Sequence, residues 1–373
     1  MNLLFYYPIG GGAPSKVSRD IFKKLFINQK QVNIDEISIF SKRKYVSSLK
    51  EEFPDINILC WSNLISLSSN YIVHIPVLPT ILPNSKFLLY LFCKIRGSKL
   101  ILQYHGDVRS ELKSSYKDIV SLLHILTYIF LPFLLKSADT IITHSYFMNN
   151  KLIKYGVSKS IVIPNAIGNE WFRDANYCEP SYSIMDKSMT SIFYHGRLSW
   201  EKGIDLLIEA IASEKLNRKY TLYIAGEGPQ KKELEKICIE KNIKQYVFFL
   251  GSLNVMEIKS YLKSADIAIY PSRFDNFPLA VLEALSVADC PVHFSRNIGI
   301  CDFIQKESNS LNTFDLSIES IVELLNNFNL LNEYDKKEMI DNQKEFAKQY
   351  TWDEVILKYI HVYNMLVHDT TVE

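Results

Sequence analysis

Glycine is scarce in this chain, and neither sign of charge is in excess. There are 13 glycines among 373 residues, fewer than the average usage of roughly 7% would give. Forty-two basic residues are matched by 41 acidic residues, for a formal net charge of +1. This balance argues against a general nucleic-acid binder, so any basic site must be local.

Paired cysteines and the usual metal signatures are also missing. The six cysteines show no C-x-x-C spacing, so we expect reduced thiols in a cytosolic protein rather than a zinc site. No D-x-D, H-E-x-x-H, G-x-S-x-G or P-loop motif occurs in the sequence. We therefore expect no cofactor and no metal, and we expect cationic side chains and helix amides to bind any phosphate.

No apolar run is long enough to be a clear membrane span. The longest uncharged run covers 119–135 and is interrupted by His124 and Pro132, which places it at the lower limit of a span. We expect helices that are buried in a domain or lie on it, and a transmembrane helix is the less favoured alternative. The N-terminal MNLLFYYPIGGG has no basic n-region, so we expect a first strand rather than a signal peptide.

The length of the chain suits two domains of about 150 to 200 residues each. Short β-branched or aromatic runs alternate with longer polar stretches in both halves, which is typical of parallel strands joined by helical crossovers. The strands predicted in the first half are 3–7, 71–76, 99–106, 139–145 and 160–167. Those predicted in the second half are 191–198, 220–228, 246–251, 266–272 and 290–295.

The predicted fold class is α/β, with two Rossmann-like doubly wound domains. We expect a first domain over 1–168, a polar linker over 169–189, a second domain over 190–350 and a terminal helix within 351–373. Nine of the 13 glycines fall at strand ends or turns. Because ligands bind at the carboxyl ends of parallel strands, these glycines predict a ligand crevice in each domain.

The stretch SRFDNFPLAVLEAL, 272–285, carries two carboxylates near the start of a predicted helix. Pro278 suits the first turn of that helix, so Asp275 and Asn276 are expected in the preceding loop. Within the helix, Leu279 and Ala280 share a face with Glu283, which lies four and three residues further on. Helix amides attract anions and carboxylates accept hydroxyl protons, so the stretch suits a phosphate and a sugar.

Three further patterns could carry chemistry. Arg197 and Lys202, in HGRLSWEKG, could together neutralise a diphosphate, although two solvated loop cations are the alternative. Gly10, Gly11 and Gly12 follow the first strand and could turn their amides toward a ligand, or simply form a turn. His105 ends a strand in QYHGDV, where it is either an ordinary core or loop residue or a functional one.

Taken together, these segments resemble the retaining group 1 glycosyltransferases, which use nucleotide-sugars and have the GT-B fold. The resemblance is strong for GRLSWEKGIDLLIEA, AGEGPQKKEL, VFFLGSL and SADIAIYPSRFDNFPLAVLEAL, and weaker for GGG, HGD, SADTIITHS and IPNAI in the first half. It implies two domains that face each other across a cleft, with the first binding the acceptor and the second the donor. It also implies that the terminal helix crosses back onto the first domain.

The resemblance further implies roles for individual residues. Arg197 and Lys202 would bind the donor diphosphate, Glu283 the ribose, and His105 would reach the donor sugar from the first domain. The other implied sugar- or donor-binding positions are Asp275, Asn276, Phe277, Leu279, Ala280, Gly11, Gly12 and Gly228. Among all the residues named in this paragraph, the catalytic ones would be His105, Asp275, Arg197 and Lys202. Asp275 replaces a more usual Glu, and Pro278 replaces a frequent Gly, so one amide donor is absent.

We therefore expect a cytoplasmic enzyme that transfers a sugar from a nucleoside-diphosphate sugar to a glycan. The alternatives are a nucleotide-sugar epimerase or phosphorylase of the same architecture, or a non-catalytic nucleotide-sugar-binding protein. Lys86, Lys94, Arg96 and Lys99 flank an apolar run, which suits contact with an anionic membrane at the inner face of the cell membrane and a polyprenyl-linked acceptor. The competing explanation is that the run packs into the core with its lysines solvated.

Overall fold

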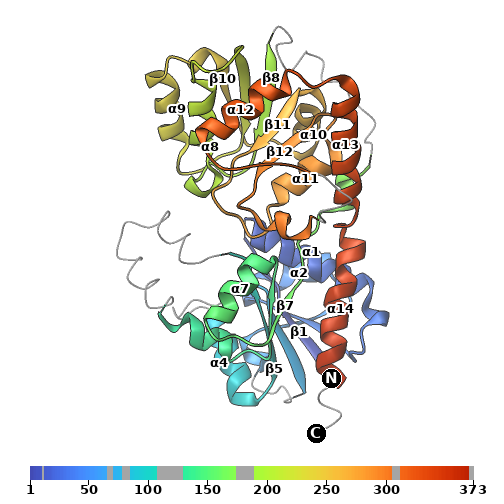
Figure 1. The fold of residues 1–373 in the computed structure, drawn as a ribbon. Helices are drawn as coiled ribbons and strands as arrows, with labels where there is room; N and C mark the ends of the chain where they lie inside the picture. Colours follow the sequence, from blue (N-terminus) through green and yellow to red (C-terminus); the bar gives the residue numbers. More distant parts are fainter. Residues whose placement is uncertain are drawn as a thin grey trace. The chain divides into compact units, whose positions relative to one another are not determined.

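The chain folds into two compact units. The structure is a computed structural model, and it describes residues 1–10, 12–64, 70–77, 85–106, 129–173, 189–304 and 311–368. Unit 1 comprises Met1–Ala166 and Trp352–Glu373, and unit 2 comprises Ile167–Thr351. Figure 1 shows a β-sheet flanked by helices in each unit.

Unit 1 is built on a seven-stranded parallel sheet of order β3-β2-β1-β4-β5-β6-β7. Its strands are β1 Asn2–Tyr6, β2 Ile37–Phe40, β3 Asn57–Leu59, β4 Tyr71–Ile75, β5 Lys99–Tyr104, β6 Thr140–Thr143 and β7 Ser160–Val162. Its helices are α1 Ala13–Ile27, α2 Val46–Glu52, α3 Trp61–Leu64, α4 Ser85–Arg96, α7 Tyr146–Lys154 and α14 Trp352–His368. Residues 129–136 are also helical.

Unit 2 repeats this plan with a six-stranded sheet of order β10-β9-β8-β11-β12-β13. Its strands are β8 Thr190–His195, β9 Tyr220–Ala225, β10 Val247–Gly251, β11 Ile267–Tyr270, β12 Val292–Ser295 and β13 Asn312–Phe314. Its helices are α8 Ile204–Ile211, α9 Lys231–Glu240, α10 Val255–Ser264, α11 Leu279–Val287, α12 Ile318–Phe328 and α13 Glu333–Lys348. Helix α8 packs with α9 and α12, and α11 packs with α10 and α13 (Figure 1).

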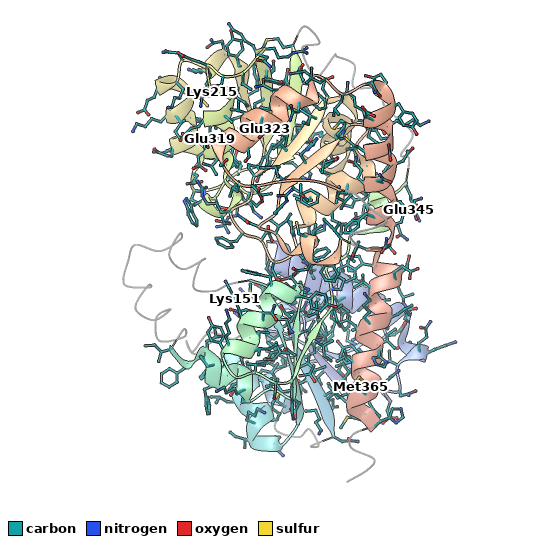
Figure 2. All side chains as sticks on the ribbon, in the orientation of Figure 1. Lys151, Lys215, Glu319, Glu323, Glu345 and Met365 are labelled. Atoms are coloured by element: carbon teal, nitrogen blue, oxygen red, sulfur yellow. The ribbon has the colours of Figure 1, made fainter. Side chains whose placement is uncertain are left out.

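Burial on both faces explains why the central strands are uniformly apolar. Strands β6 and β11 are buried at every position, as expected for parallel strands covered by helices on both sides. The covering helices are amphipathic: Ile321 and Leu325 of α12 are buried, whereas Glu319 and Glu323 lie on its exposed side (Figure 2). Both sheets therefore have the doubly wound arrangement that the sequence predicts.

The C-terminal helix α14 packs on unit 1, as the resemblance implied. It lies against α1, where Lys24 forms an ion pair with Asp353. Two buried tyrosines of α14 bond to the sheet: Tyr363 OH lies 2.6 Å from His74 Nδ1, and Gln103 Nε2 donates to Tyr359 OH at 3.0 Å. Buried polar contacts of this kind fix the register of the helix on the sheet.

The structure adds elements that the sequence analysis did not predict. The sequence did not predict strands β2, β3 and β13, which are three or four residues long. Within the expected linker, Asn169–Trp171 form a 3₁₀-helix, and Trp171 is buried in the core of unit 2. The described part of that segment, 169–173, thus packs with unit 2, and 174–188 lie outside the described residues.

Candidate functional site

The strand order of unit 2 identifies where a ligand should bind. The strand order reverses between β8 and β11. The chain continues from β8 toward one edge of the sheet, through β9 and β10, and from β11 toward the other edge, through β12 and β13. In open α/β sheets a crevice forms at this switch point, beyond the carboxyl ends of the strands. The two loops at the crevice are 196–203 and 271–278, which contain Arg197, Lys202 and Asp275.

Glycine allows these loops to pack closely. Gly203 has φ 67°, and a Cβ there would lie 1.9 Å from the carbonyl oxygen of Pro271. A Cβ on Gly228 would lie 2.2 Å from the carbonyl oxygen of Leu198. Arg273 N donates to Glu201 O at 2.7 Å, which ties the two loops directly. Gly228 thus supports the backbone of the 196–203 loop.

Lys202 and Asp275 meet in the crevice. Their side chains form an ion pair and are 20% and 17% exposed. The backbone of Asp275 is held in turn, because Gly299 N donates to its carbonyl oxygen at 2.9 Å. Arg197 is exposed, and its guanidinium has no hydrogen bond or ion pair to the residues that the structure describes. The sequence predicted two converging cations, and the structure adds that one of them is already paired.

Glu283 is the buried carboxylate of the site. His195 Nε2 lies 3.2 Å from Glu283 Oε2, and Tyr270 OH lies 2.7 Å from His195 Nδ1. Burial raises the pKa of Tyr270 well above its usual value, so its hydroxyl stays protonated and donates to Nδ1. His195 Nε2–H then donates to the carboxylate, which fixes the orientation of Glu283.

His195 and Tyr270 are not among the site residues that the sequence predicts. They are the last residues of β8 and β11, the two strands at the switch point. Polar or aromatic residues at strand ends are often ordinary core residues, so only their position beside the switch point could have drawn attention to them.

The start of α11 differs in detail from the prediction. Pro278 caps the helix with φ −71° and ψ 119°, so α11 begins one residue later, at Leu279. The ring of Phe277 is buried against Phe303 and Tyr350, with ring centroids 5.5 Å and 5.4 Å away. Phe277 can therefore contact a ligand only through its backbone.

The remaining residues predicted around this helix differ in their exposure. Asn276 is buried, whereas Leu279 and Ala280 are partly exposed. The first amides of a helix have no partner within it, so the start of α11 offers donors to an anion.

His105 lies in unit 1, at the carboxyl end of β5. Its Nε2 lies 2.7 Å from the carbonyl oxygen of Pro76, so Nε2 carries the proton. His144 Nδ1 likewise donates to Ile163 O at 2.9 Å, and its Nε2 lies 3.1 Å from His105 Nδ1. Burial lowers the pKa of both rings, of His144 to about 4. In the neutral pair no proton lies between the two rings, and Gln103 Nε2 donates to His144 instead, at 3.1 Å.

The glycine turn after β1 is only partly described. Gly11 lies outside the described residues, and Gly12 precedes α1 with φ 94°. Beside the turn is a cavity of about 320 Å³ in unit 1, whose lining includes Gly10, Arg19 and Lys23. Arg19 donates to Gly10 O at 2.8 Å, and Lys23 pairs with Glu52 at 2.8 Å. The carboxyl end of β1 is therefore hollow and basic.

The basic and apolar segment of unit 1 divides into two faces. Leu89, Tyr90 and Cys93 of α4 are buried, whereas Leu88, Leu91 and Ile95 are exposed. Lys94 and Arg96 are exposed with them. Lys86 is partly buried, which lowers its pKa, and Lys99 begins β5. Only two of the four predicted cations therefore accompany the exposed apolar residues.

The helical residues 129–136 continue this exposed surface. Ile129, Phe130 and Phe133 are exposed, and Tyr90 OH lies 2.8 Å from Ser137 Oγ, which joins this segment to α4. Residues 119–128 of the long uncharged run lie outside the described residues. Within the described ranges, every helix is too short or too polar to cross a membrane.

Comparison with known proteins agrees with this arrangement. The family model for glycosyl transferases group 1 matches residues 185–346, which include the whole crevice of unit 2. Residues 185–346 thus match the group 1 glycosyltransferase family.

Two uncharacterized glycosyltransferases of Methanocaldococcus jannaschii are among the similar proteins. MJ1607 is 29% identical over 53% of this chain and 50% of its own length. MJ1178 is 27% identical over 71% of this chain and 68% of its own length. The match thus spans about half of the first relative and two thirds of the second.

Solved structures show the same fold over the full chain. Anabaena HepE in complex with UDP-glucose has a TM-score of 0.66 and 16% identity, and the match covers 100% of this chain and 99% of that one. At this identity the likeness shows the fold alone, which is GT-B: two Rossmann-like domains in one chain.

Proposed function

We propose that the chain is a retaining transferase that moves a sugar from a nucleoside-diphosphate sugar to a hydroxyl of a lipid-linked glycan. Such an enzyme would serve surface polysaccharide or glycoprotein glycan assembly. The observation that carries the proposal is the crevice of unit 2, where Lys202, Asp275 and Glu283 lie around the switch point.

In this proposal the diphosphate of the donor is the leaving group. Among the described residues the Arg197 guanidinium has no partner to give up, so it supplies the first attraction for the phosphates. Lys202 is neutralised by Asp275 in the free protein, and the incoming phosphates compete for it. As the bond to the sugar breaks, both cations and the amides at the start of α11 stabilise the developing negative charge.

The two carboxylates take different parts of the donor. Asp275, once Lys202 turns to the phosphates, accepts hydrogen bonds from sugar hydroxyls. Glu283 accepts from the ribose hydroxyls, and the Tyr270–His195 chain keeps its carboxylate in place. A site built to pair with hydroxyls discriminates strongly against ligands that lack them, because its polar groups would be left unpaired.

His105 is proposed to contact the donor sugar from unit 1. Its Nε2 is bound to Pro76, so a sugar hydroxyl would donate to Nδ1, where the neutral His144 supplies no proton. We assign no protein nucleophile, no metal and no cofactor to the reaction. Positioning of the acceptor hydroxyl beside the sugar supplies much of the remaining rate enhancement.

The acceptor is proposed to bind unit 1. The basic cavity beside Gly10 suits a polar or anionic glycan. The exposed apolar residues of α4 and 129–136, together with Lys94 and Arg96, suit the anionic surface of a membrane. A peripheral enzyme at the inner face of the cell membrane could then reach a polyprenyl-linked acceptor.

The proposal is tested by following the donor by proton NMR in excess EDTA, with a polyprenyl-linked glycan acceptor. Transfer should persist in EDTA, and the product should keep the anomeric configuration of the donor. Activity that returns only with magnesium, or an inverted anomeric signal, would refute the corresponding part. A control with donor and water alone separates this function from an epimerase, which would convert the donor without an acceptor.

A further inference from the structure

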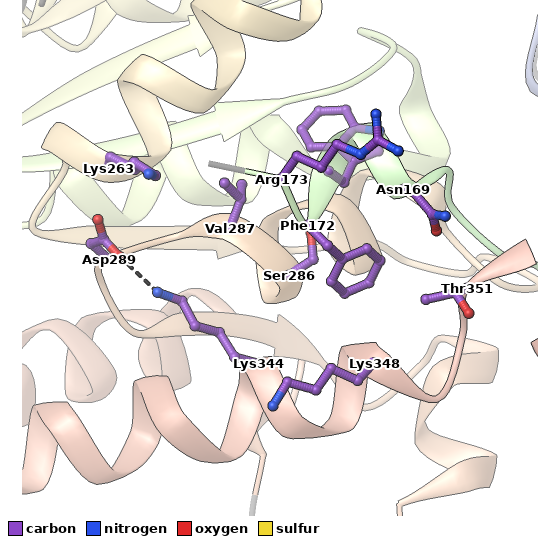
Figure 3. A pocket seen from close by; sticks show the side chains of 11 residues that line it. Asn169, Phe172, Arg173, Lys263, Ser286, Val287, Asp289, Lys344, Lys348 and Thr351 are labelled. Carbon is purple, nitrogen blue, oxygen red and sulfur yellow. Dashed lines mark hydrogen bonds and ion pairs between the residues drawn. The ribbon is translucent and has the colours of Figure 1, made fainter. Parts of the chain in front are cut away.

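Unit 2 contains a second cavity at the C-terminal end of α11. Its volume is about 560 Å³, which is within the usual range of roughly 300 to 1,000 Å³ for small-molecule sites. Figure 3 shows Lys344 and Lys348 approaching it from α13, and Asn169, Phe172 and Arg173 approaching from the segment before the undescribed 174–188. None of the candidate donor-binding residues lines it.

The lining of this cavity is strongly positive. Arg173, Lys263, Lys344 and Lys348 contribute four cations, and Asp289 is the single carboxylate. Lys344 pairs with Asp289 at 2.7 Å. Lys348 pairs with Glu345 at 2.8 Å, but both side chains are 64% exposed, and such surface pairs are weak. Among the described residues, the guanidinium of Arg173 has no hydrogen-bond or ion-pair partner.

The segment that carries Arg173 is held rigidly. Lys259 is buried, and its Nζ donates to the carbonyl oxygens of Glu170 and, at 3.0 Å, of Arg173. Trp171, which lies between Glu170 and Arg173 in the sequence, is buried in the core of unit 2. A cation on a fixed backbone loses less entropy when it binds an anion, so this arrangement favours binding.

The indole of Trp171 forms part of the wall of the same cavity. Its Nε1 is buried without a hydrogen-bond partner in the described structure, which is uncommon for a buried N–H. Phe172 adds an apolar wall, and Asn169 and Thr351 add polar side chains suited to hydroxyl groups.

We infer that this cavity is a binding site for a small phosphate monoester with a hydroxylated body, the chemical class of the sugar phosphates. The four cations of the lining attract the phosphoryl group through their combined positive charge. The polar side chains and the phenyl ring of Phe172 receive the remainder of the molecule. The inference does not depend on the proposed transferase activity, because no residue of the donor crevice takes part.

The test is isothermal titration calorimetry of the full chain with glucose 6-phosphate and with inorganic phosphate. The variant is Arg173→Gln combined with Lys348→Gln, which removes two charges and leaves the Lys344–Asp289 pair intact. Lys336→Gln is the control, because Lys336 lies on the same helix and also pairs with a glutamate three residues before it, Glu333. Arg197→Gln is the control for binding in the donor crevice.

We expect the double variant to bind glucose 6-phosphate at least about tenfold more weakly than the wild type, with both controls unchanged. In the wild type, the indole N–H resonance of Trp171, assigned with Trp171→Phe, should shift when the ligand is added. Three outcomes would overturn the inference: no binding of either probe, equal binding by the double variant, or loss of binding in Arg197→Gln. The first two would mean that the lysines only balance the C-terminal ends of the helices.

Discussion

At the scale of single residues, Arg197 and Lys202 are the most direct test of the donor crevice. Arg197→Ala and Lys202→Ala should each lower donor turnover by about 10- to 1,000-fold, because each removes a cation from the leaving group. Arg197 lies in a loop and Lys202 ends a short 3₁₀-helix, so the fold should persist, as circular dichroism would show. Lys236→Ala and Arg218→Ala are matched controls on the surface of unit 2. Near-normal turnover in both crevice variants would mean that Arg197 and Lys202 do not bind the donor diphosphate.

His105 offers a second test at this scale, because its proposed contact is with the sugar only. His105→Phe should lower turnover by about 10- to 1,000-fold and leave the affinity for the nucleoside diphosphate unchanged. Turnover and calorimetric binding of the diphosphate are the two measurements. Equal loss of both would mean that His105 acts through the stability of unit 1, where it bonds to Pro76 and His144.

At the scale of elements, α4 carries the membrane hypothesis. Leu91→Asp together with Ile95→Asp should abolish co-sedimentation with anionic liposomes, because both side chains are exposed on this helix and charge opposes insertion into the interface. Ile239→Asp, at an equally apolar exposed position of α9, is the control. If the wild-type protein stays in the supernatant with anionic and neutral liposomes alike, the membrane hypothesis is wrong.

Elements also show what the sequence could and could not predict. The strands at both switch points are predicted within a few residues, because buried parallel strands are continuous apolar runs. Strand β3, with only Asn57–Leu59, has no such signal. The motif around Phe277 predicted ligand contact, but it could not distinguish a ring packed against Phe303 from one facing a ligand. Such distinctions depend on contacts between segments far apart in the sequence.

At the scale of the whole molecule, three buried histidines predict sensitivity to acid. Burial lowers the pKa of His74 to about 3, and the pKa values of His144 and His293 to about 4. In the unfolded chain the pKa of a histidine is about 6.5. Below that pH the unfolded chain takes up protons that the folded chain does not, so stability is lost as pH falls from about 6.5 toward 4. Thermal unfolding measured across this range should show a steep fall.

The variant His293→Phe isolates one of these groups in unit 2. It should make the dependence of the unfolding temperature on pH shallower, because one buried proton acceptor is gone. An unchanged slope would mean that His293 is already protonated in the folded state or that other groups dominate.

The central claim is that the crevice between β8 and β11 binds the nucleoside diphosphate of a sugar donor. The most direct measurement is the thermal shift of the wild-type chain and of Lys202→Ala with a panel of UDP-, GDP-, ADP- and dTDP-sugars. We expect at least one donor to raise the unfolding temperature of the wild type, and this rise to be largely lost in Lys202→Ala. If no donor stabilises the wild type, or if the variant is stabilised equally, this crevice is not the donor site.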